Sequence, residues 1–228
     1  MIINLLDESL TLDPPGSIAV IGAGPLGLEA ALYGRFLGYS VTIIEAVGVG
    51  SSLESRRGLP VPMIPDRCLS PLAVSAITAQ TRDALPIVLP TTIDQWIDDG
   101  LAAVAAVDLL RGQIICPARV TRIETVPIEP DEEDEDVSDV PPDFRLIYSD
   151  TDGSTASVDA EAVIVATGPT QDFQIDFALP AEYLFRIGGT VDDVDEETYF
   201  WTGLHEIAKI YAQLAGRAGL DLYRPRGS

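Results

Sequence analysis

The amino-acid sequence predicts an α/β fold, in which crossover helices connect the strands of a parallel sheet and a three-stranded antiparallel β-meander is added. Three observations support this fold class. Residues 18–44 hold a strand, a helix and a second strand, residues 92–116 hold a helical pattern and a further apolar run, and residues 118–160 hold three short strand-like segments. Alternating strands and helices are typical of parallel sheets, whereas consecutive short strands pair as meanders.

The first unit consists of a strand, a tight turn, a helix and a second strand. The apolar run from Ile18 to Ile21 leads directly into a glycine-rich turn. From Pro25 to Leu37 the apolar residues recur at helical intervals, and Gly38 separates this helix from a second apolar run, Val41 to Ile44. We therefore expect two neighbouring parallel strands joined by a crossover helix.

Three glycines and an acid in this unit predict a dinucleotide site. Gly22 permits the turn, Gly24 lets a pyrophosphate approach the backbone, and Gly27 lets the helix pack closely on the strands. The phosphates would lie at the helix N-terminus, where free N–H groups and the helix dipole favour an anion. Glu45 ends the second strand, where a carboxylate can accept both ribose hydroxyls. The alternative is an ordinary structural turn.

The rest of the predicted parallel sheet comes from residues 47–116. Residues 47–90 are rich in proline, and only Leu72 to Gln80 has a helical pattern, which indicates a long excursion over the sheet edge. Residues 92–110 carry apolar residues at helical spacing, and the run Ile114 to Cys116 follows. This order predicts a crossover helix and a third parallel strand.

The meander is expected in the segments "ARVTRIETV", "FRLIYS" and "STASVDA". Residues 128–142 interrupt it with an acidic loop that includes "DEEDED". A buried strand is then predicted at Ala162 to Ala166, and it runs straight into Thr167 and Gly168. That turn would lie at the carboxyl edge of the sheet, where open α/β sheets bind ligands.

The last predicted element is an amphipathic helix that starts at Thr198. Its apolar face consists of Leu204, Ile207, Ala208, Tyr211 and Ala215. His205, the single histidine of the chain, is a candidate proton donor, although such a histidine is more commonly a helix-surface residue. Phe200 and Trp201 are candidates for packing or for covering a ligand. We expect one domain over residues 1–223, with residues 224–228 as a tail outside the fold.

Composition and charge exclude several classes of partner. The 228 residues carry 36 acids against 14 bases, a net charge of −22, which repels nucleic acid and anionic membranes. The apolar runs are too short for a membrane helix, and the N-terminus does not resemble a signal peptide, so we expect a cytoplasmic protein. Cys68 and Cys116 form no CxxC motif, which favours buried reduced thiols and no metal site.

The glycine motif continues into Ala31 and Gly38, and this longer pattern resembles FAD-binding proteins with two dinucleotide-binding domains. That superfamily includes the pyridine nucleotide-disulfide reductases and the flavin monooxygenases. The segment "VIVATG", residues 163–168, is similar to its second motif, and "LFRIGG", residues 184–189, stands where its final motif is expected. The resemblance implies a Rossmann-like FAD-binding domain and FAD as the cofactor.

The resemblance also implies a set of cofactor contacts. Around the ADP half, it places the pyrophosphate against Gly22, Gly24, Pro25 and Leu26, the ribose at Glu45 and the adenine at Val120. Thr167 and Gly168 would flank the cofactor, while Gly188 and Gly189 would approach the flavin half. Arg56 or Arg57 is expected to contact a phosphate or ribose, with a plain surface arginine as the alternative. The N-terminus of the last helix would face the flavin pyrimidine.

Two departures from the family pattern bear on the activity. Relatives that use NAD(P)H usually insert a second nucleotide domain before the final motif, whereas only residues 170–183 intervene here, too few for a βαβ unit. The final motif normally continues with aspartate, and Gly189 takes that place. Asp192 or Asp193 is a candidate replacement.

The sequence leaves three functions open. The first is an FAD-dependent oxidoreductase that takes electrons from a free nicotinamide, a small substrate or a partner protein. The second is an NAD(P)-binding dehydrogenase, and the third is a non-catalytic FAD-binding or partner-binding scaffold. The substrate, the electron donor and the oligomeric state cannot be read from the residues.

Overall fold

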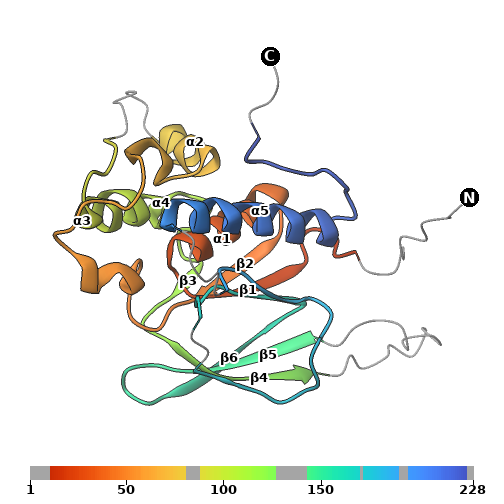
Figure 1. The fold of residues 1–228 in the computed structure, drawn as a ribbon. Coiled ribbons are helices and arrows are strands. Elements are labelled where there is room, and N and C mark those ends of the chain that lie inside the picture. Colours follow the sequence, from red (N-terminus) through yellow and green to blue (C-terminus); the bar gives the residue numbers. More distant parts are fainter. Residues whose placement is uncertain (1–10, 81–87, 127–142, 170–171, 190–194, 225–228) are drawn as a thin grey trace, which may run out of the picture.

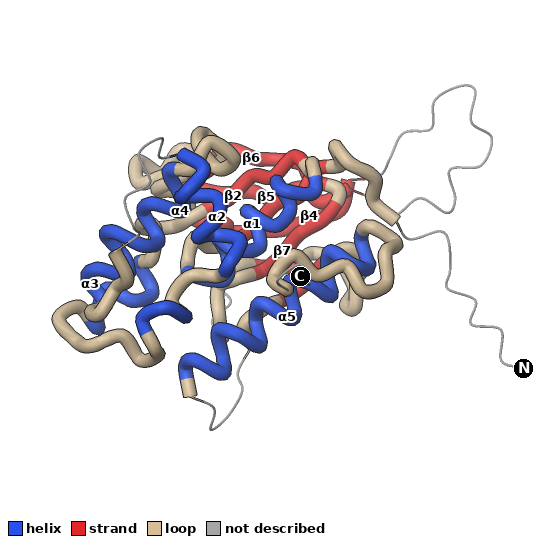
Figure 2. The backbone as a smooth tube through the Cα atoms, turned by 90° about the horizontal axis from the view of Figure 1, so that it is seen from above, coloured by secondary structure: helices blue, strands red, loops and turns tan. Residues whose placement is uncertain are grey.

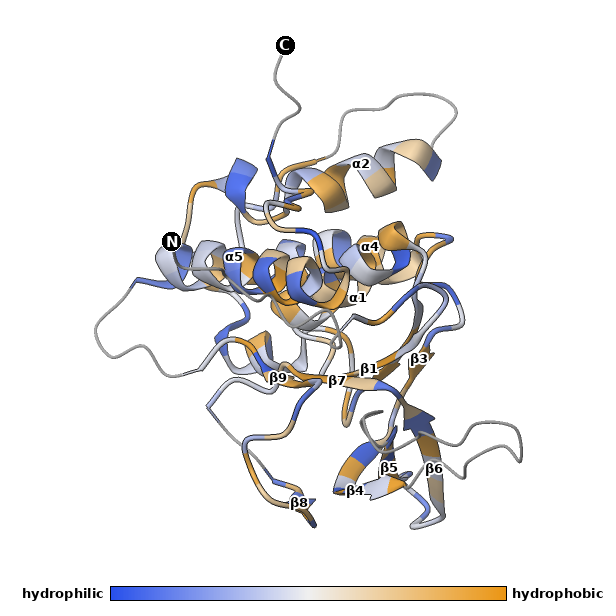
Figure 3. Ribbon diagram, turned by 90° about the vertical axis from the view of Figure 1, so that its right-hand side faces the viewer, coloured by the Kyte–Doolittle hydropathy of each residue, from blue (hydrophilic) through white to orange (hydrophobic). Residues whose placement is uncertain are grey.

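The protein is arranged in three layers in a computed structural model that describes residues 11–80, 88–126, 143–169, 172–189 and 195–224 (Figure 1). Helices form the upper layer, a five-stranded sheet the middle layer, and a four-stranded sheet the lower layer. The same order is visible from the side in Figure 3. The α/β fold class predicted from the sequence is therefore confirmed.

The five-stranded sheet is entirely parallel. Its strands lie in the order β3-β2-β1-β7-β9. Their bounds are β1 Ser17–Ile21, β2 Ser40–Ile44, β3 Ile114–Ile115, β7 Ala162–Val165 and β9 Leu184–Arg186. Because all five strands run the same way, the turns after β1, β2 and β7 meet at one edge of the sheet. This edge is where the sequence places its glycine turn and Thr167.

Helices cover one face of this sheet, as the view from above shows (Figure 2). The longer helices are α1 Pro25–Leu37, α2 Pro71–Gln80 and α5 Glu196–Leu214. The crossover to β3 is built from α3 Ile93–Gln95, a π-helical turn η3 Trp96–Leu101 and α4 Ala102–Ala106. Two short 3-10 helices, η1 Ser51–Arg56 and η2 Pro65–Arg67, precede α2.

Aromatic stacking joins α1 to α5. The rings of Tyr33 and Tyr211 stack with their centroids 5.0 Å apart, and the Tyr211 hydroxyl donates to the Ala30 carbonyl at 2.8 Å. A Cβ atom at Gly34 would overlap the Tyr211 hydroxyl, so only glycine permits this close approach. The helix that follows the glycine turn is therefore held firmly by the last helix of the chain.

The predicted meander covers the opposite face of the parallel sheet. It consists of β4 Arg119–Val126, β5 Asp143–Ser149 and β6 Thr155–Ala160, paired antiparallel in that order. Side chains such as Ile123, Phe144 and Leu146 pack against Ile21 and Val163 in a second core. A short strand, β8 Gln174–Ile175, pairs parallel to β4 and was not predicted.

The excursion after β2 lines the carboxyl edge of the sheet through η1, and its Leu53, Met63, Leu69 and Leu72 pack into the main core with the helices. One detail differs from the sequence-based expectation. Cys68 is buried, as expected, whereas Cys116 is exposed at the end of β3. The acidic segment 128–142, Asp192 and Asp193 lie outside the described residues.

Among the described residues, no helix is both long and apolar enough to cross a membrane.

Candidate functional site

A cavity of about 890 Å³ opens at the carboxyl edge of the parallel sheet. This volume lies in the upper part of the range for small-molecule and cofactor sites. Its walls come from the β1–α1 turn, the end of β2, η1, the start of β4, the end of β7 and the first turn of α5. The sequence-predicted residues that line it are Gly22, Gly24, Pro25, Leu26, Glu45, Val120, Thr167 and Gly168.

The N-terminus of α1 faces this cavity without a cap of its own. Gly24 is the N-cap residue, Pro25 follows it, and in the part of the chain that the structure describes no side chain caps the first turn. A Cβ atom at Gly24 would meet only the Ser52 Oγ, at 3.5 Å, and would project into open space. The backbone is therefore bare where an anion can approach the helix dipole. This arrangement fits a pyrophosphate.

The other two glycines of the motif serve the turn and the packing. Gly22 has φ of 103°, a conformation that favours glycine, and a Cβ atom there would lie 2.9 Å from the Ala166 carbonyl oxygen. A Cβ atom at Gly27 would overlap the carbonyl oxygen of Gly22. Gly27 consequently allows the close helix–strand packing that the sequence predicts, and it does not line the cavity.

Glu45 is buried and its carboxylate holds the surrounding turns together. Its Oε2 accepts from the Ala23 N–H at 2.7 Å, and its Oε1 accepts from the Val47 and Gly48 N–H groups at 2.8 and 3.2 Å. The Ser51 hydroxyl adds a fourth bond at 3.2 Å. Three donors occupy Oε1, so a ribose hydroxyl would have to approach Oε2, which carries one donor. The ribose contact stays a prediction.

The cavity wall formed by the start of β4 and by Phe173 suits a flat apolar group. Val120 is buried at the start of β4, and Ala118 and Phe173 line the cavity beside it. Thr167 and Gly168 follow β7, where Gly168 has φ of 67°. The position of Val120 is compatible with the adenine contact that the resemblance implies.

Part of the cavity lining is aromatic and apolar, and we call this part the distal chamber. It is lined by Met63, Trp96, Ile187, Tyr199 and Phe200. Trp96 and Phe200 meet edge to face at 6.2 Å, and the Trp96 indole N–H donates to the Cys68 carbonyl at 2.9 Å. Sequence reasoning missed Met63, Trp96 and Tyr199, because residues so far apart in the chain form no local pattern.

Tyr199 contacts the turn after β9, which holds the two glycines that the resemblance places beside the flavin half. Neither glycine lines the cavity. The Gly188 carbonyl accepts from the Tyr199 hydroxyl at 2.7 Å, and its N–H donates to the Glu206 carboxylate at 3.2 Å. Burial, and then the charge of Glu206, raises the pKa of Tyr199, so its phenol stays protonated. The Tyr199 hydroxyl therefore lies against the β9 turn, and the approach of Gly188 and Gly189 to the flavin half stays a prediction.

The structure also separates the two candidate arginines. Arg56 lines the cavity, and its guanidinium donates to Glu196 at 2.7 Å. Arg57 lies outside the cavity wall and bonds instead to Glu54, Asp94 and Asp98. Its hydrogen bonds lower the pKa of Glu54 and Asp98. Adjacent residues of a 3-10 helix point in different directions, which the sequence alone does not resolve.

His205 does not reach the cavity. It is exposed on α5, where its ring Nδ1 lies 2.7 Å from the Trp201 carbonyl oxygen one helical turn earlier. This contact is that of a helix-surface residue, the alternative that the sequence analysis considered more common. Phe200 is buried and also lines the cavity, so both packing and covering a ligand stay open for it, whereas Trp201 is half-buried, packs against the core and does not line the cavity.

No protein-family model and no curated protein matches the sequence. Similar solved structures include a bacillithiol disulfide reductase from Bacillus cereus, at 17% identity and a TM-score of 0.46. They also include an oxidised steroid monooxygenase bound to NADP, at 24% and 0.46, and S-allyl-L-cysteine S-oxygenase from Allium sativum, at 16% and 0.40.

These likenesses are partial on both sides. They cover 67%, 68% and 67% of this chain, and 40%, 27% and 36% of the other chains, respectively. The chain thus spans less than half the length of the structures it resembles. With TM-scores below 0.5, they do not assign a function, and the case for one depends on the cavity itself.

Proposed function

We propose that the cavity binds FAD and that the chain is the FAD-binding domain of an oxidoreductase. The observation that carries this proposal is one continuous cavity that connects the bare N-terminus of α1 with the aromatic distal chamber. An ADP moiety needs the first feature, because its pyrophosphate is anionic. A flat heteroaromatic ring needs the second.

The residues divide between the two halves of the ligand. Gly22, Gly24 and the first turn of α1 would hold the pyrophosphate, and Val120 would cover the adenine. The distal chamber offers Trp96 and Tyr199 to the isoalloxazine ring. The three-ring isoalloxazine would contact more of these apolar walls than the single ring of nicotinamide.

When bound, FAD supplies the electron and hydride transfer that amino-acid side chains do not provide. The chain would contribute binding, orientation and exclusion of water. Residues 172–183, between β7 and β9, contain only the short strand β8 as regular structure. They offer no second glycine turn for a nicotinamide nucleotide, so we propose that electrons come from a small substrate or a partner protein.

A binding comparison tests the proposal. The purified protein, freed of any bound nucleotide, is titrated with FAD, NAD⁺ and ADP, followed by flavin fluorescence and calorimetry. We expect FAD to bind at least tenfold more tightly than ADP, because the distal chamber adds contacts, and NAD⁺ to bind no better than ADP. Tighter binding of NAD⁺ than of FAD would contradict the proposal and favour the dehydrogenase alternative.

Reduction of the bound flavin then tests the oxidoreductase assignment. We expect dithionite to bleach it fully, and NADH or NADPH to reduce it slowly and without saturation under anaerobic conditions. Rapid, saturable bleaching by either nucleotide would show a nicotinamide site and contradict the proposed external donor.

A further inference from the structure

An ion pair crosses the cavity between η1 and the first turn of α5. The Arg56 Nη1 lies 2.7 Å from the Glu196 Oε2, and both side chains line the cavity. They are 32% and 44% exposed, so the pair is within reach of water and of any ligand. Exposed ion pairs contribute only about 0–1 kcal/mol to stability. A ligand can therefore replace either partner at a small cost in free energy.

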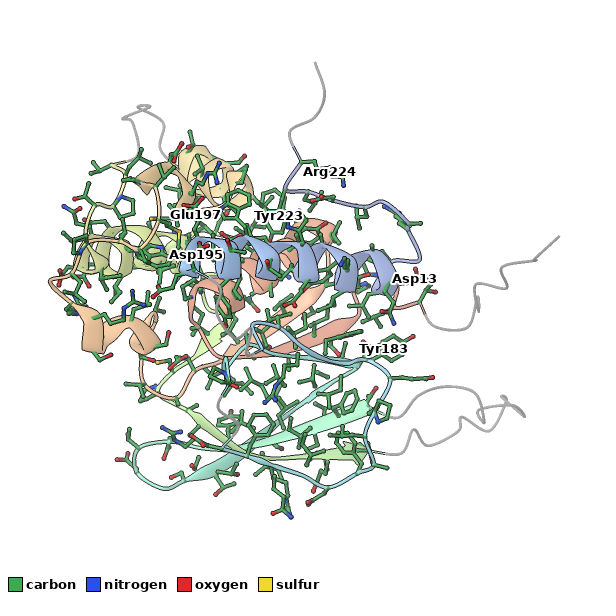
Figure 4. All side chains as sticks on the ribbon, in the orientation of Figure 1. Asp13, Tyr183, Asp195, Glu197, Tyr223 and Arg224 are labelled. Atoms are coloured by element: carbon green, nitrogen blue, oxygen red, sulfur yellow. The ribbon has the colours of Figure 1, made fainter. Side chains whose placement is uncertain are left out.

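A neighbouring ion pair provides a contrast. Glu197, the next residue of α5, pairs with Arg67 of η2 and also accepts from the Ile64 N–H at 3.4 Å. Neither Arg67 nor Glu197 lines the cavity. Figure 4 labels Glu197 and the capping Asp195 at this end of α5. The two acids differ by one position and tie the same excursion to the same helix, but only Glu196 faces the ligand.

Arg56 is positioned next to the proposed phosphate site. Its helix, η1, is tied to the glycine turn by the Gly50 N–H, which donates to the Ala23 carbonyl at 3.0 Å. Ser52 of the same helix lies 3.5 Å from the position of a Cβ atom on Gly24. Arginine accepts carboxylate and phosphate as alternative partners, because its planar guanidinium matches both.

We propose that Arg56 is a phosphate-binding residue that Glu196 holds in the absence of ligand, and that the pyrophosphate takes the guanidinium from the carboxylate on binding. This inference rests on the proposed function of the cavity. Glu196 is then a competitor of the ligand and lowers its affinity. A carboxylate that merely positioned Arg56 would have the opposite effect and would raise it.

The test is a binding cycle with ADP as the probe, measured by calorimetry at a fixed ionic strength of 0.15 M. We expect Glu196→Gln to bind ADP about two- to fivefold more tightly than the wild type, because Arg56 no longer has to leave a carboxylate. Arg56→Gln is expected to bind about tenfold more weakly, through loss of a charge-assisted hydrogen bond. In the Arg56→Gln background, Glu196→Gln should change the affinity by less than about 1.5-fold.

Glu197→Gln is the matched control, because it removes the same charge one residue away and frees Arg67 instead of Arg56. We expect an ADP affinity within about 1.5-fold of the wild type. Equal effects of Glu196→Gln and Glu197→Gln would mean that only the general charge matters, and weaker binding by Glu196→Gln would mean a positioning role. Either result overturns the exchange.

The two proposals fail separately. A wild-type protein that binds ADP but not FAD contradicts the flavin assignment and leaves the exchange testable with ADP. A wild-type protein that binds neither contradicts both. Far-UV circular dichroism checks that each variant is folded before its affinity is compared.

Discussion

Two helix N-termini face the same cavity, and they differ in their capping and in the charge of their first turns. At α1, Gly24 provides no capping side chain and the first turn holds no acid. At α5, Asp195 accepts from the Thr198 N–H at 2.9 Å and from its hydroxyl at 2.8 Å. Glu196 and Glu197 then occupy the first turn. The hydrogen bonds to Thr198 lower the pKa of Asp195, so this cap stays ionised.

The difference shows which helix is left for a ligand. A helix N-terminus carries about half a positive charge and up to four free N–H groups, and it is stabilised by any anion that reaches it. At α5, the carboxylates of Asp195, Glu196 and Glu197 provide that anion. The first turn of α1 holds no acid, so a ligand can provide it there. The resemblance implies that the α5 dipole faces the flavin ring. In this structure three acids offset that dipole, so we expect an anionic ligand to bind at α1.

The largest effect that would sharpen this contrast is expected at Gly24 in the turn after β1, with Gly189 in the turn after β9 as the control. Gly24→Val would fill the space above the bare turn, and we expect ADP and FAD binding to weaken by at least about a thousandfold. A Cβ atom at Gly189, near the start of α5, meets nothing within 4 Å, so Gly189→Val should bind within about twofold of the wild type. Calorimetry on folded variants measures both.

Equal loss of binding in the two glycine variants would break the contrast. It would place the ligand against the turn after β9, as the family resemblance implies, and against Tyr199 as its cover.

The next largest effect is expected on the pH dependence of stability, and it comes from a buried acid in α1. Glu29 accepts from the Ser70 N–H at 3.2 Å and from its hydroxyl at 2.7 Å. Burial raises its pKa to about 7, although these hydrogen bonds lower it. It is therefore largely neutral up to that pH and does not oppose an anion at the helix start. Unlike the acids of α5, it does not act as a cap.

This raised pKa predicts a pH-dependent stability. Between about pH 4.5 and 7, the unfolded chain releases the Glu29 proton while the folded chain keeps it, so the free energy of unfolding falls as the pH rises, by about 3 kcal/mol in total. Glu29→Gln should remove this loss and flatten the profile. Urea unfolding at several pH values measures it, with the exposed Asp152→Asn as the control. Parallel profiles for wild type and Glu29→Gln would mean that Glu29 titrates normally.

A substitution of Glu45 tests whether its carboxylate holds the turns beside the N-terminus of α1 in their observed shape. In Glu45→Gln, an amide group replaces one carboxylate oxygen and leaves at least one of the Ala23, Val47 or Gly48 N–H groups without its acceptor. We expect a loss of about 1.5–3 kcal/mol in the free energy of unfolding. Urea denaturation measures this loss. An unchanged stability would mean that the turn holds its shape without the carboxylate, and Glu45 would then be free for the ribose.

The smallest effect is expected at the cap of α5. Asp195→Ala removes the two bonds to Thr198 and should cost about 1 kcal/mol of stability. Because we expect the ligand to bind at the N-terminus of α1 and not at that of α5, the ADP affinity should change by less than about twofold. A tenfold change in affinity would show that the capped end takes part in binding after all.

Much of the framework was predictable because its signals are local. The strand, turn, helix and strand from Ser17 to Ile44, the meander and β7 each show their period or their glycines within a few residues. The Pro25–Leu37 helix matched the sequence-based bounds, since proline starts it and Gly38, with φ of 94°, ends it. The two-residue strand β8 showed no such signal, because its pairing with β4 gives it its only regular structure.

What the sequence by itself determined is the glycine turn, its place at the carboxyl edge of a parallel sheet and the residues that surround it. The tertiary structure alone decided that Arg56 and not Arg57 enters the cavity and that Tyr199 covers Gly188. It also decided that Met63 of the excursion, Trp96 of the crossover and the aromatic residues of α5 line one chamber. The physical reason is the separation along the chain. Arg56 and Glu196 are 140 positions apart, and contacts of that kind follow from how packed layers meet, not from the periodicity of either segment.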